Sequence, residues 1–392
     1  METNLYTGRE QTLVKHLILQ KYLERFAHII GYAWSTLTYV DCFSGPWNVR
    51  SEDLKDSSFS IALNELRKAR ETHAANGRSL SLRCLFLEKD PEAFARLKEF
   101  ADSVTDAEVL PLNLELEEAI VDIAKFLRKG GSGSFPFIFI DPTGWSGFAM
   151  DVIEPLLKFN PSEVLINFMT GDIPRFVTSP HQQTEQSFLR LFGSKEFKKE
   201  VEGLVGINRE DALVEEYRAI VAARGKFKFT CSAIVLHPEF DRTRFHLIYA
   251  TRHAKGVAVF KDAERFAMQE MEHIRDSVRV RKHEEDVQLV LLPEMWHDSS
   301  HFDSLRNRYT ERAKVAVLNL LRGKETVPYD DAWELALNFP LTWESDLKGW
   351  IKSWAKQSSG EHLELAGMTP RQQVPKYGAG NILIWRRPSK TG

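Results

Sequence analysis

The sequence predicts an α/β protein with a mainly parallel sheet that ends in an antiparallel hairpin, followed by a small winged-helix-like domain. Over residues 36–168, five short apolar runs alternate with amphipathic helical segments, which is the pattern of a doubly wound parallel sheet. Two further strand-like runs follow with only seven residues, HPEFDRT, between them. A connection this short makes the two runs antiparallel neighbours.

The alternation can be followed along the chain. An amphipathic helix is expected over 12–30, ahead of the first strand at Thr36. Asp90 and Pro91 follow the second strand as an N-cap and a first-turn proline, so that the next helix begins almost without a loop. The five strands are expected in the runs TLTYV, LRCLFLE, EVLPL, FPFIFI and EVLINFM.

The closing hairpin decides which variant of the fold is expected. A mostly helical insertion spans about 170–225, and the antiparallel runs FKFTCSAIVL and RFHLIYATRH come after it. A parallel series finished by such a hairpin separates the methyltransferase form of the Rossmann sheet from the dehydrogenase form. We therefore expect a Rossmann-type methyltransferase-like domain over 1–285 and a winged-helix-like domain over 286–392.

The C-terminal domain is expected from three helical segments and two strands around a glycine-rich loop. The segments are RYTERAKVAVLNLL, YDDAWELALNF and TWESDLKGWIKSWAK, and the strands are EHLEL and NILIWRR. Nucleic acid is a possible partner of this domain, although a solvated surface explains its basic residues equally well. The basic residues are Arg371, Lys376, Arg386 and Arg387.

Composition excludes several classes of protein. The 392 residues carry 52 basic and 55 acidic side chains, so the net charge of −3 does not fit a protein that simply coats nucleic acid. No apolar run is long enough to span a membrane, and a cytoplasmic location is expected. The 3 cysteines are far apart, and His297 with His301 lacks a third ligand, so neither a disulfide framework nor a metal site is expected.

In such a sheet, ligands bind beyond the carboxyl ends of the strands, and the first of these loops begins at Asp41. Asp41 can accept a hydrogen bond from a ligand's amino group, and Ser44 with Gly45 lets a ligand approach the backbone. A β-turn with a capping aspartate is the alternative interpretation. The pattern G-x-G-x-x-G is absent, which makes a dinucleotide cofactor less favoured.

The next two loops offer residues for a nucleoside. Glu88 ends the second strand, where a carboxylate can accept both hydroxyls of a ribose. Because Asp90 already serves as the N-cap, Glu88 is left for this role. Asn113 follows the third strand and can recognise an adenine edge through its amide, although asparagine is also an ordinary loop residue.

The fourth strand leads into Asp141-Pro142-Thr143-Gly144-Trp145, which resembles the Asp-Pro-Pro-aromatic motif of methyltransferases that act on nucleobase amino groups. The lone pair of such an amine is delocalised, and hydrogen bonds accepted by a carboxylate and a carbonyl help to localise it. Asp141 and the Pro142 carbonyl would accept these bonds, and Trp145 or Phe148 would stack on the base. A rigid strand-to-helix turn is the alternative.

These motifs resemble the three-Cys-motif partner protein family, TcmP. The family implies a methyltransferase-like fold and a partner protein similar to radical-S-adenosylmethionine enzymes, and it adds Lys15, His16 and Phe43 to the expected cofactor-binding residues. Trp47 departs from the glycine that is usual in the family, and Thr143 from the usual phenylalanine. The matching stretches are Lys15-His16 with Tyr22, Tyr39 to Pro46, Phe86 to Asp90, Ile140 to Gly144 and Leu247 to His253.

Two functions follow as expectations. The first is transfer of a methyl group from S-adenosylmethionine to an amino nitrogen, on a nucleic acid base, with Asp141, Pro142 and Trp145 at the acceptor. The second is a non-catalytic subunit that keeps the methyltransferase fold and serves a three-Cys-motif partner. A fold alone does not decide between them, because function resides in the site.

Overall fold

The chain divides into two compact units, Met1–His297 and Asp298–Gly392. The boundary expected from the sequence, at 285/286, stays a prediction. The structure is a computed structural model and describes residues 3–45, 49–171, 173, 182–285, 299–357 and 360–387. Each unit is treated by itself below.

The first unit is built on a seven-stranded sheet with the order β3-β2-β1-β4-β5-β7-β6. The strands β1 to β5 pair in parallel, and β7 lies antiparallel to both β5 and β6. This is the methyltransferase form of the Rossmann sheet that the sequence predicts. The strands are β1 Thr36–Asp41, β2 Ser81–Leu87, β3 Glu108–Leu112, β4 Ser134–Ile140, β5 Glu163–Phe168, β6 Phe229–Leu236 and β7 Thr243–Thr251.

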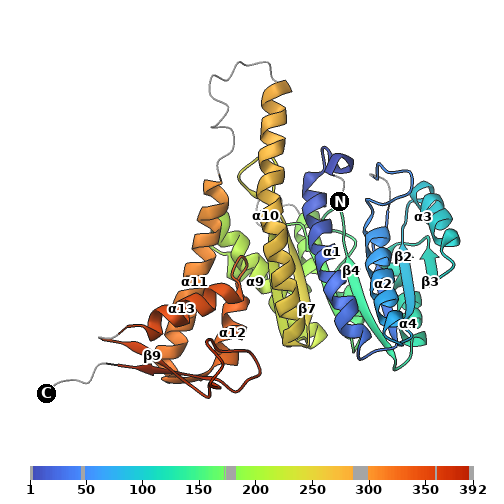
Figure 1. The fold of residues 1–392 in the computed structure, drawn as a ribbon. Coiled ribbons are helices and arrows are strands. Elements are labelled where there is room, and N and C mark those ends of the chain that lie inside the picture. Colours follow the sequence, from blue (N-terminus) through green and yellow to red (C-terminus); the bar gives the residue numbers. More distant parts are fainter. Residues whose placement is uncertain are drawn as a thin grey trace. The chain divides into compact units, whose positions relative to one another are not determined.

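Helices cover both faces of the sheet, so the central strands are buried on both sides (Figure 1). On one face α1, α2 and α10 pack side by side, and on the other α4, α5 and α9 cover an apolar core. The insertion after β5 contributes α7, α8 and α9. These helices are α1 Glu10–Gly31, α2 Ser58–Ala75, α3 Pro91–Ser103, α4 Leu116–Lys129, α5 Met150–Leu157, α7 Gln182–Phe192, α8 Phe197–Val201, α9 Gly206–Gly225 and α10 Ala254–Glu285.

The second unit follows the order helix, strand, helix, helix, strand, strand. The short strand β8, which the sequence analysis did not include, joins the two expected strands in a sheet of order β8-β10-β9, antiparallel throughout. This order is the one expected for a winged helix, and that assignment stays a prediction. The elements are α11 Ser300–Lys324, β8 Thr326–Pro328, α12 Tyr329–Leu337, α13 Glu344–Ala355, β9 His362–Ala366 and β10 Ile382–Arg386.

Candidate functional site

Two neighbouring pockets open at the carboxyl ends of the parallel strands. We call them the Asp141 pocket, of about 490 Å³, and the Glu88 pocket, of about 440 Å³. Pro142 and Thr143, directly after β4, line both pockets and form a shared wall. Both volumes lie in the range of small-molecule sites, and the position is the one at which doubly wound sheets bind ligands.

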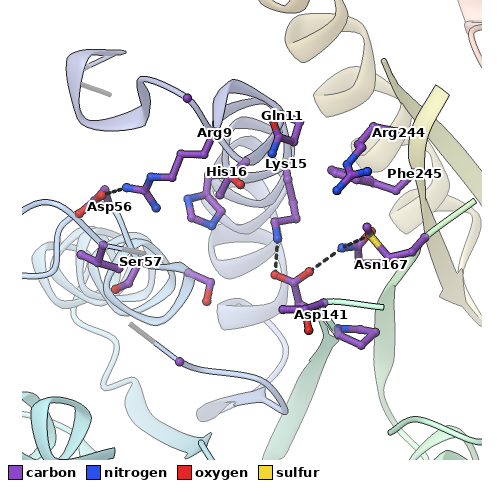
Figure 2. A pocket seen from close by; sticks show the side chains of 18 of the residues that line it. Arg9, Gln11, Lys15, His16, Asp56, Ser57, Asp141, Asn167, Arg244 and Phe245 are labelled. Carbon is purple, nitrogen blue, oxygen red and sulfur yellow. Dashed lines mark hydrogen bonds and ion pairs between the residues drawn. The ribbon is translucent and has the colours of Figure 1, made fainter. Parts of the chain in front are cut away.

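The Asp141 pocket is centred on a carboxylate held from two sides (Figure 2). Lys15 of α1 forms an ion pair with Asp141 Oδ2, and Asn167 Nδ2 at the end of β5 donates to Asp141 Oδ1 at 2.8 Å. The side chains of Lys15 and Asp141 are each 11% exposed. A carboxylate has about four lone-pair positions, so Asp141 can still accept a hydrogen bond from a ligand.

The far wall of this pocket comes from the N-terminus and from the loop before α2. Arg9 forms an ion pair with the buried Asp56, whose carboxylate also accepts the backbone N–H groups of Arg50 and Ser51 at 3.0 and 3.2 Å (Figure 2). These bonds join the N-terminal segment to the loop before α2.

His16 lines the same pocket and is buried. Its Nδ1 shares a hydrogen bond of 2.9 Å with the Tyr6 hydroxyl. Burial, together with the charges of Lys15 and Arg9, lowers the pKa of His16 well below its usual value. The imidazole is therefore neutral at physiological pH and adds no charge to the pocket.

The Glu88 pocket has the features of a nucleoside site. It is lined by Phe43 after β1, by Glu88 at the end of β2, and by Leu114 after β3. The Glu88 carboxylate accepts the Asp90 N–H at 2.7 Å, and burial raises its pKa. A carboxylate beside apolar and aromatic side chains at this position can accept ribose hydroxyls while the base packs on the apolar surface.

Asp41 and Ser44 are buried and line neither of the two pockets. The Asp41 carboxylate accepts hydrogen bonds from the Ser58 hydroxyl at 2.6 Å, the Tyr39 hydroxyl at 3.1 Å and the Phe43 N–H at 3.1 Å. Burial raises the pKa of Asp41 to about 6. Its bonds shape the loop after β1, in contrast to the ligand contact expected from the sequence.

Ser44 ties the same loop to the end of β2. Its N–H donates to the Leu87 carbonyl at 2.7 Å, and its Oγ accepts the Leu87 N–H at 3.2 Å. Gly45, the next residue, does line the Asp141 pocket. Pro46 and Trp47 lie outside the described residues, so the effect of Trp47 on the cofactor loop stays a prediction.

Three residues expected at the site lie elsewhere. The exposed Asn113 donates from Nδ2 to the carbonyls of Glu88 and Lys89 at 2.9 and 3.1 Å, so it fixes the loop after β2 and lines neither pocket. The Trp145 ring stacks on Phe188 of α7 with centroids 5.8 Å apart, and Phe148 is fully buried in the core. Phe148 is therefore not available to stack on a ligand, whereas Trp145 is partly buried and lines neither pocket, and its stacking role stays a prediction.

The sequence analysis missed Asn167, Arg244 and Phe245, which line the Asp141 pocket. A signal for each was present. Asn167 is a polar residue near the carboxyl end of the apolar fifth strand. Arg244 and Phe245 begin β7, and the start of an antiparallel strand lies at the same edge as the ends of its parallel neighbours.

Two of the four basic residues expected near the strands of the second unit, Arg386 and Arg387, have acidic partners. Arg386 pairs with Glu364 at 2.9 Å across the β9–β10 hairpin, and Arg322 pairs with Glu361 at 2.5 Å. Arg387 donates to the Arg322 carbonyl at 2.6 Å. These exposed pairs reduce the positive charge that a nucleic acid would meet on the strands.

The described residues contain no group of three or more His, Cys, Asp or Glu side chains suited to holding a metal ion. His297 lies outside the described residues. Among the described helices, none combines the length and the apolar composition needed to cross a lipid bilayer.

No family model matches the chain, and no curated protein is significantly similar to it. Among solved structures, protein LPL1258 of family DUF519 from Legionella pneumophila is 11% identical over 66% of this chain and 91% of its own, with a TM-score of 0.36. A DUF574 family protein from Streptomyces avermitilis is 12% identical over 60% and 83%, with a TM-score of 0.32. Loganic acid methyltransferase with SAH is 9% identical over 73% and 91%, with a TM-score of 0.30.

Likenesses this distant do not assign a function. The fold class therefore follows from the strand order and the antiparallel β7, and the site from its own geometry. None of the comparisons supports the three-Cys-motif partner family in particular, and that resemblance stays a prediction.

Proposed function

We propose that the protein is an S-adenosylmethionine-dependent methyltransferase acting on an amino nitrogen of a nucleic acid base. The observation that carries this proposal is the pair of adjacent pockets, one with Glu88 and one with Asp141, that share the wall formed by Pro142 and Thr143. A methyl donor bound through its nucleoside in the first pocket would face an acceptor bound in the second.

The residues of the chain have separate roles in this proposal. Glu88 accepts the ribose hydroxyls, and Phe43 and Leu114 pack beside the base of the donor, whose sulfonium supplies the methyl group. Asp141 and the Pro142 carbonyl accept the N–H groups of the acceptor amine, which localises its lone pair toward the methyl carbon. The nitrogen would gain the methyl group as the bond from that group to sulfur breaks, leaving S-adenosylhomocysteine, and would lose one proton, which Asp141 is assigned to receive.

The charge of the Asp141 pocket supports a phosphate-bearing acceptor. Four of its described lining residues are cationic, against two carboxylates, and His16 is neutral. A cleft with a surplus of positive charge attracts anions and disfavours cationic acceptors such as protein lysine or arginine. The cationic residues are Arg9, Lys15, Arg50 and Arg244.

The test is transfer of a labelled methyl group from S-adenosylmethionine to a panel of single-stranded RNA and DNA. Transfer is expected with the wild-type protein and should fall by a factor of about 100 or more in Asp141→Asn, which keeps the shape of the side chain but removes its charge. An Asp122→Asn variant, changed on the exposed surface of α4, should keep the wild-type rate. Absence of transfer to every nucleic acid tested would contradict the proposal.

A second candidate is the non-catalytic subunit that serves a three-Cys-motif partner. The ion pair between Lys15 and Asp141 favours this non-catalytic role, because a subunit that does not transfer methyl groups needs no carboxylate free for an acceptor. Donor binding without transfer to any acceptor, together with capture of a co-expressed three-Cys-motif protein, would favour the second candidate.

A further inference from the structure

The side chain of Asn167 in the Asp141 pocket has one unsatisfied atom. Asn167 is 3% exposed, and its Nδ2 donates to Asp141 Oδ1 at 2.8 Å and approaches Met169 Sδ at 3.6 Å. Its Oδ1 is buried and has no hydrogen-bond partner among the described residues. The amide cannot simply be reversed, because an ionised carboxylate only accepts hydrogen bonds and requires the nitrogen of Asn167 beside it.

A buried carbonyl oxygen without a donor is destabilising, so such atoms in folded proteins call for an explanation. Asn167 lines the pocket, and a ligand there can supply the missing N–H. Figure 2 shows Lys15, Asp141 and Asn167 gathered at one place in the pocket, from α1, the loop after β4 and β5. They present one cationic donor, one carboxylate and one unpaired carbonyl.

We infer that this trio recognises guanine, and that the 2-amino group of guanine is the nitrogen methylated; the inference rests on the proposed function. The Watson–Crick edge of guanine offers one acceptor, O6, followed by N–H donors at N1 and at the 2-amino group. Lys15 matches O6, and Asp141 with Asn167 Oδ1 matches the N–H groups.

The other bases match the trio less well. The amino group of adenine carries two N–H hydrogens, which the proposed function gives to Asp141 and the Pro142 carbonyl, and its N1 can accept from Lys15, but the edge has no third N–H for Asn167 Oδ1. Cytosine offers one amino group beside two acceptors and has the same deficit, and uracil has no amino group. A base that leaves a buried acceptor unpaired is rejected by the cost of that unpaired atom.

The Pro142 carbonyl does not change which base matches the pocket best. With Asp141 and Asn167 Oδ1, the Pro142 carbonyl makes three acceptors that face the edge of the base. Guanine is the base whose edge carries three N–H hydrogens, at N1 and on the 2-amino group. The positive surplus of the pocket fits the phosphate next to the guanine, and it excludes a guanidinium or an ammonium, which would also supply several N–H groups.

The experiment uses the full chain and uridine hexanucleotides that carry one central guanine, adenine, cytosine or hypoxanthine. Binding is measured by fluorescence anisotropy, with and without saturating S-adenosylhomocysteine. The guanine oligonucleotide should bind about tenfold or more tightly than those with adenine or cytosine. Hypoxanthine keeps O6 and N1–H but lacks the 2-amino group, and it should fall between guanine and adenine.

Asn167→Ala should bring the affinity for guanine down to that for adenine. Asn76→Ala is the matched control, because the side chain of this exposed asparagine, directly after α2, donates only to the Thr72 carbonyl among the described residues. It should leave every affinity unchanged. Equal binding of the four oligonucleotides, a preference for adenine or cytosine, or no binding would overturn the inference.

The two proposals fail in different ways. If S-adenosylhomocysteine does not bind or no methyl group is transferred, the proposed function fails, whereas a guanine preference lost in Asn167→Ala would still show that the pocket recognises this base. If transfer occurs on the amino group of adenine or cytosine, the proposed function holds and the guanine assignment is wrong.

Discussion

Two regions of the molecule carry oppositely charged pairs, and they differ in burial. In the Asp141 pocket, Lys15 and Asp141 are each 11% exposed, whereas Arg386 and Glu364 on the β9–β10 hairpin are 53% and 48% exposed. Because water screens the exposed pair, it contributes little to stability. In the buried pair, removing either charge leaves the other one buried and uncompensated. Burial therefore distinguishes a prepared site from an ordinary charged surface.

The largest expected effect is on the buried pair. Lys15→Met leaves the Asp141 charge without its cation, and we expect a loss of about 3 kcal/mol in the free energy of unfolding, measured by urea denaturation. Lys21→Met is the control, since the pair of Lys21 with Glu24 lies on the same helix but is exposed, and it should cost less than about 0.5 kcal/mol. Equal losses in the two variants would remove the distinction between the regions.

The double variant Lys15→Met with Asp141→Asn sharpens this test. It removes both charges, so it should recover part of the stability lost in Lys15→Met alone. If the two changes are simply additive, the ion pair does not couple these residues.

A smaller effect concerns pH and the buried Asp41. Burial raises its pKa to about 6 in the folded state from 3.8, so well below pH 3.8 the carboxyl is protonated in both states, and above pH 6 the folded protein holds a penalised charge. The wild-type protein should lose about 2 to 3 kcal/mol relative to Asp41→Asn as the pH rises from 4 to 7. Thermal denaturation at several pH values measures this difference.

An Asp122→Asn variant, exposed on α4, provides the baseline for that comparison. Its stability relative to the wild type should change little over the same pH range. If the difference in stability between wild type and Asp41→Asn stays constant with pH, the pKa of Asp41 is not raised in the folded protein.

The smallest effect is expected on the exposed hairpin. Arg386→Glu with Arg387→Glu should change the free energy of unfolding by less than about 1 kcal/mol. RNA binding and its salt dependence should also stay close to wild type, because Arg386 is already paired with Glu364. A large loss of binding, measured by anisotropy at several salt concentrations, would indicate that the second unit, and not the pocket, contacts the nucleic acid.

Much of the first unit could be predicted from the sequence, because apolar periodicity specifies strands and helices and because parallel strands end at one edge. This placed Glu88 and Asp141 at that edge without any knowledge of contacts. The hairpin gave the antiparallel pair of strands for the same reason, since a short loop forces the chain to reverse.

The side-chain partners could not be predicted in this way. Lys15 and Asp141 are 126 positions apart, and the turn of α1 that brings them together depends on helix packing. Trp145 follows the motif of a stacking residue, yet the insertion supplies Phe188, on which the partly buried ring stacks at the edge of the core. Asn113 bonds to two nearby carbonyls, a local alternative that its sequence context does not reveal.

The central claim is that the Glu88 pocket holds the methyl donor and the Asp141 pocket the acceptor. Calorimetric titration of S-adenosylmethionine into the wild type, Glu88→Gln and Asp141→Asn tests it most directly. We expect Glu88→Gln to weaken binding by about tenfold or more, through the lost charge-assisted bonds to the ribose, and Asp141→Asn to change it little. Unchanged binding in Glu88→Gln, or loss of binding in Asp141→Asn alone, would contradict the account.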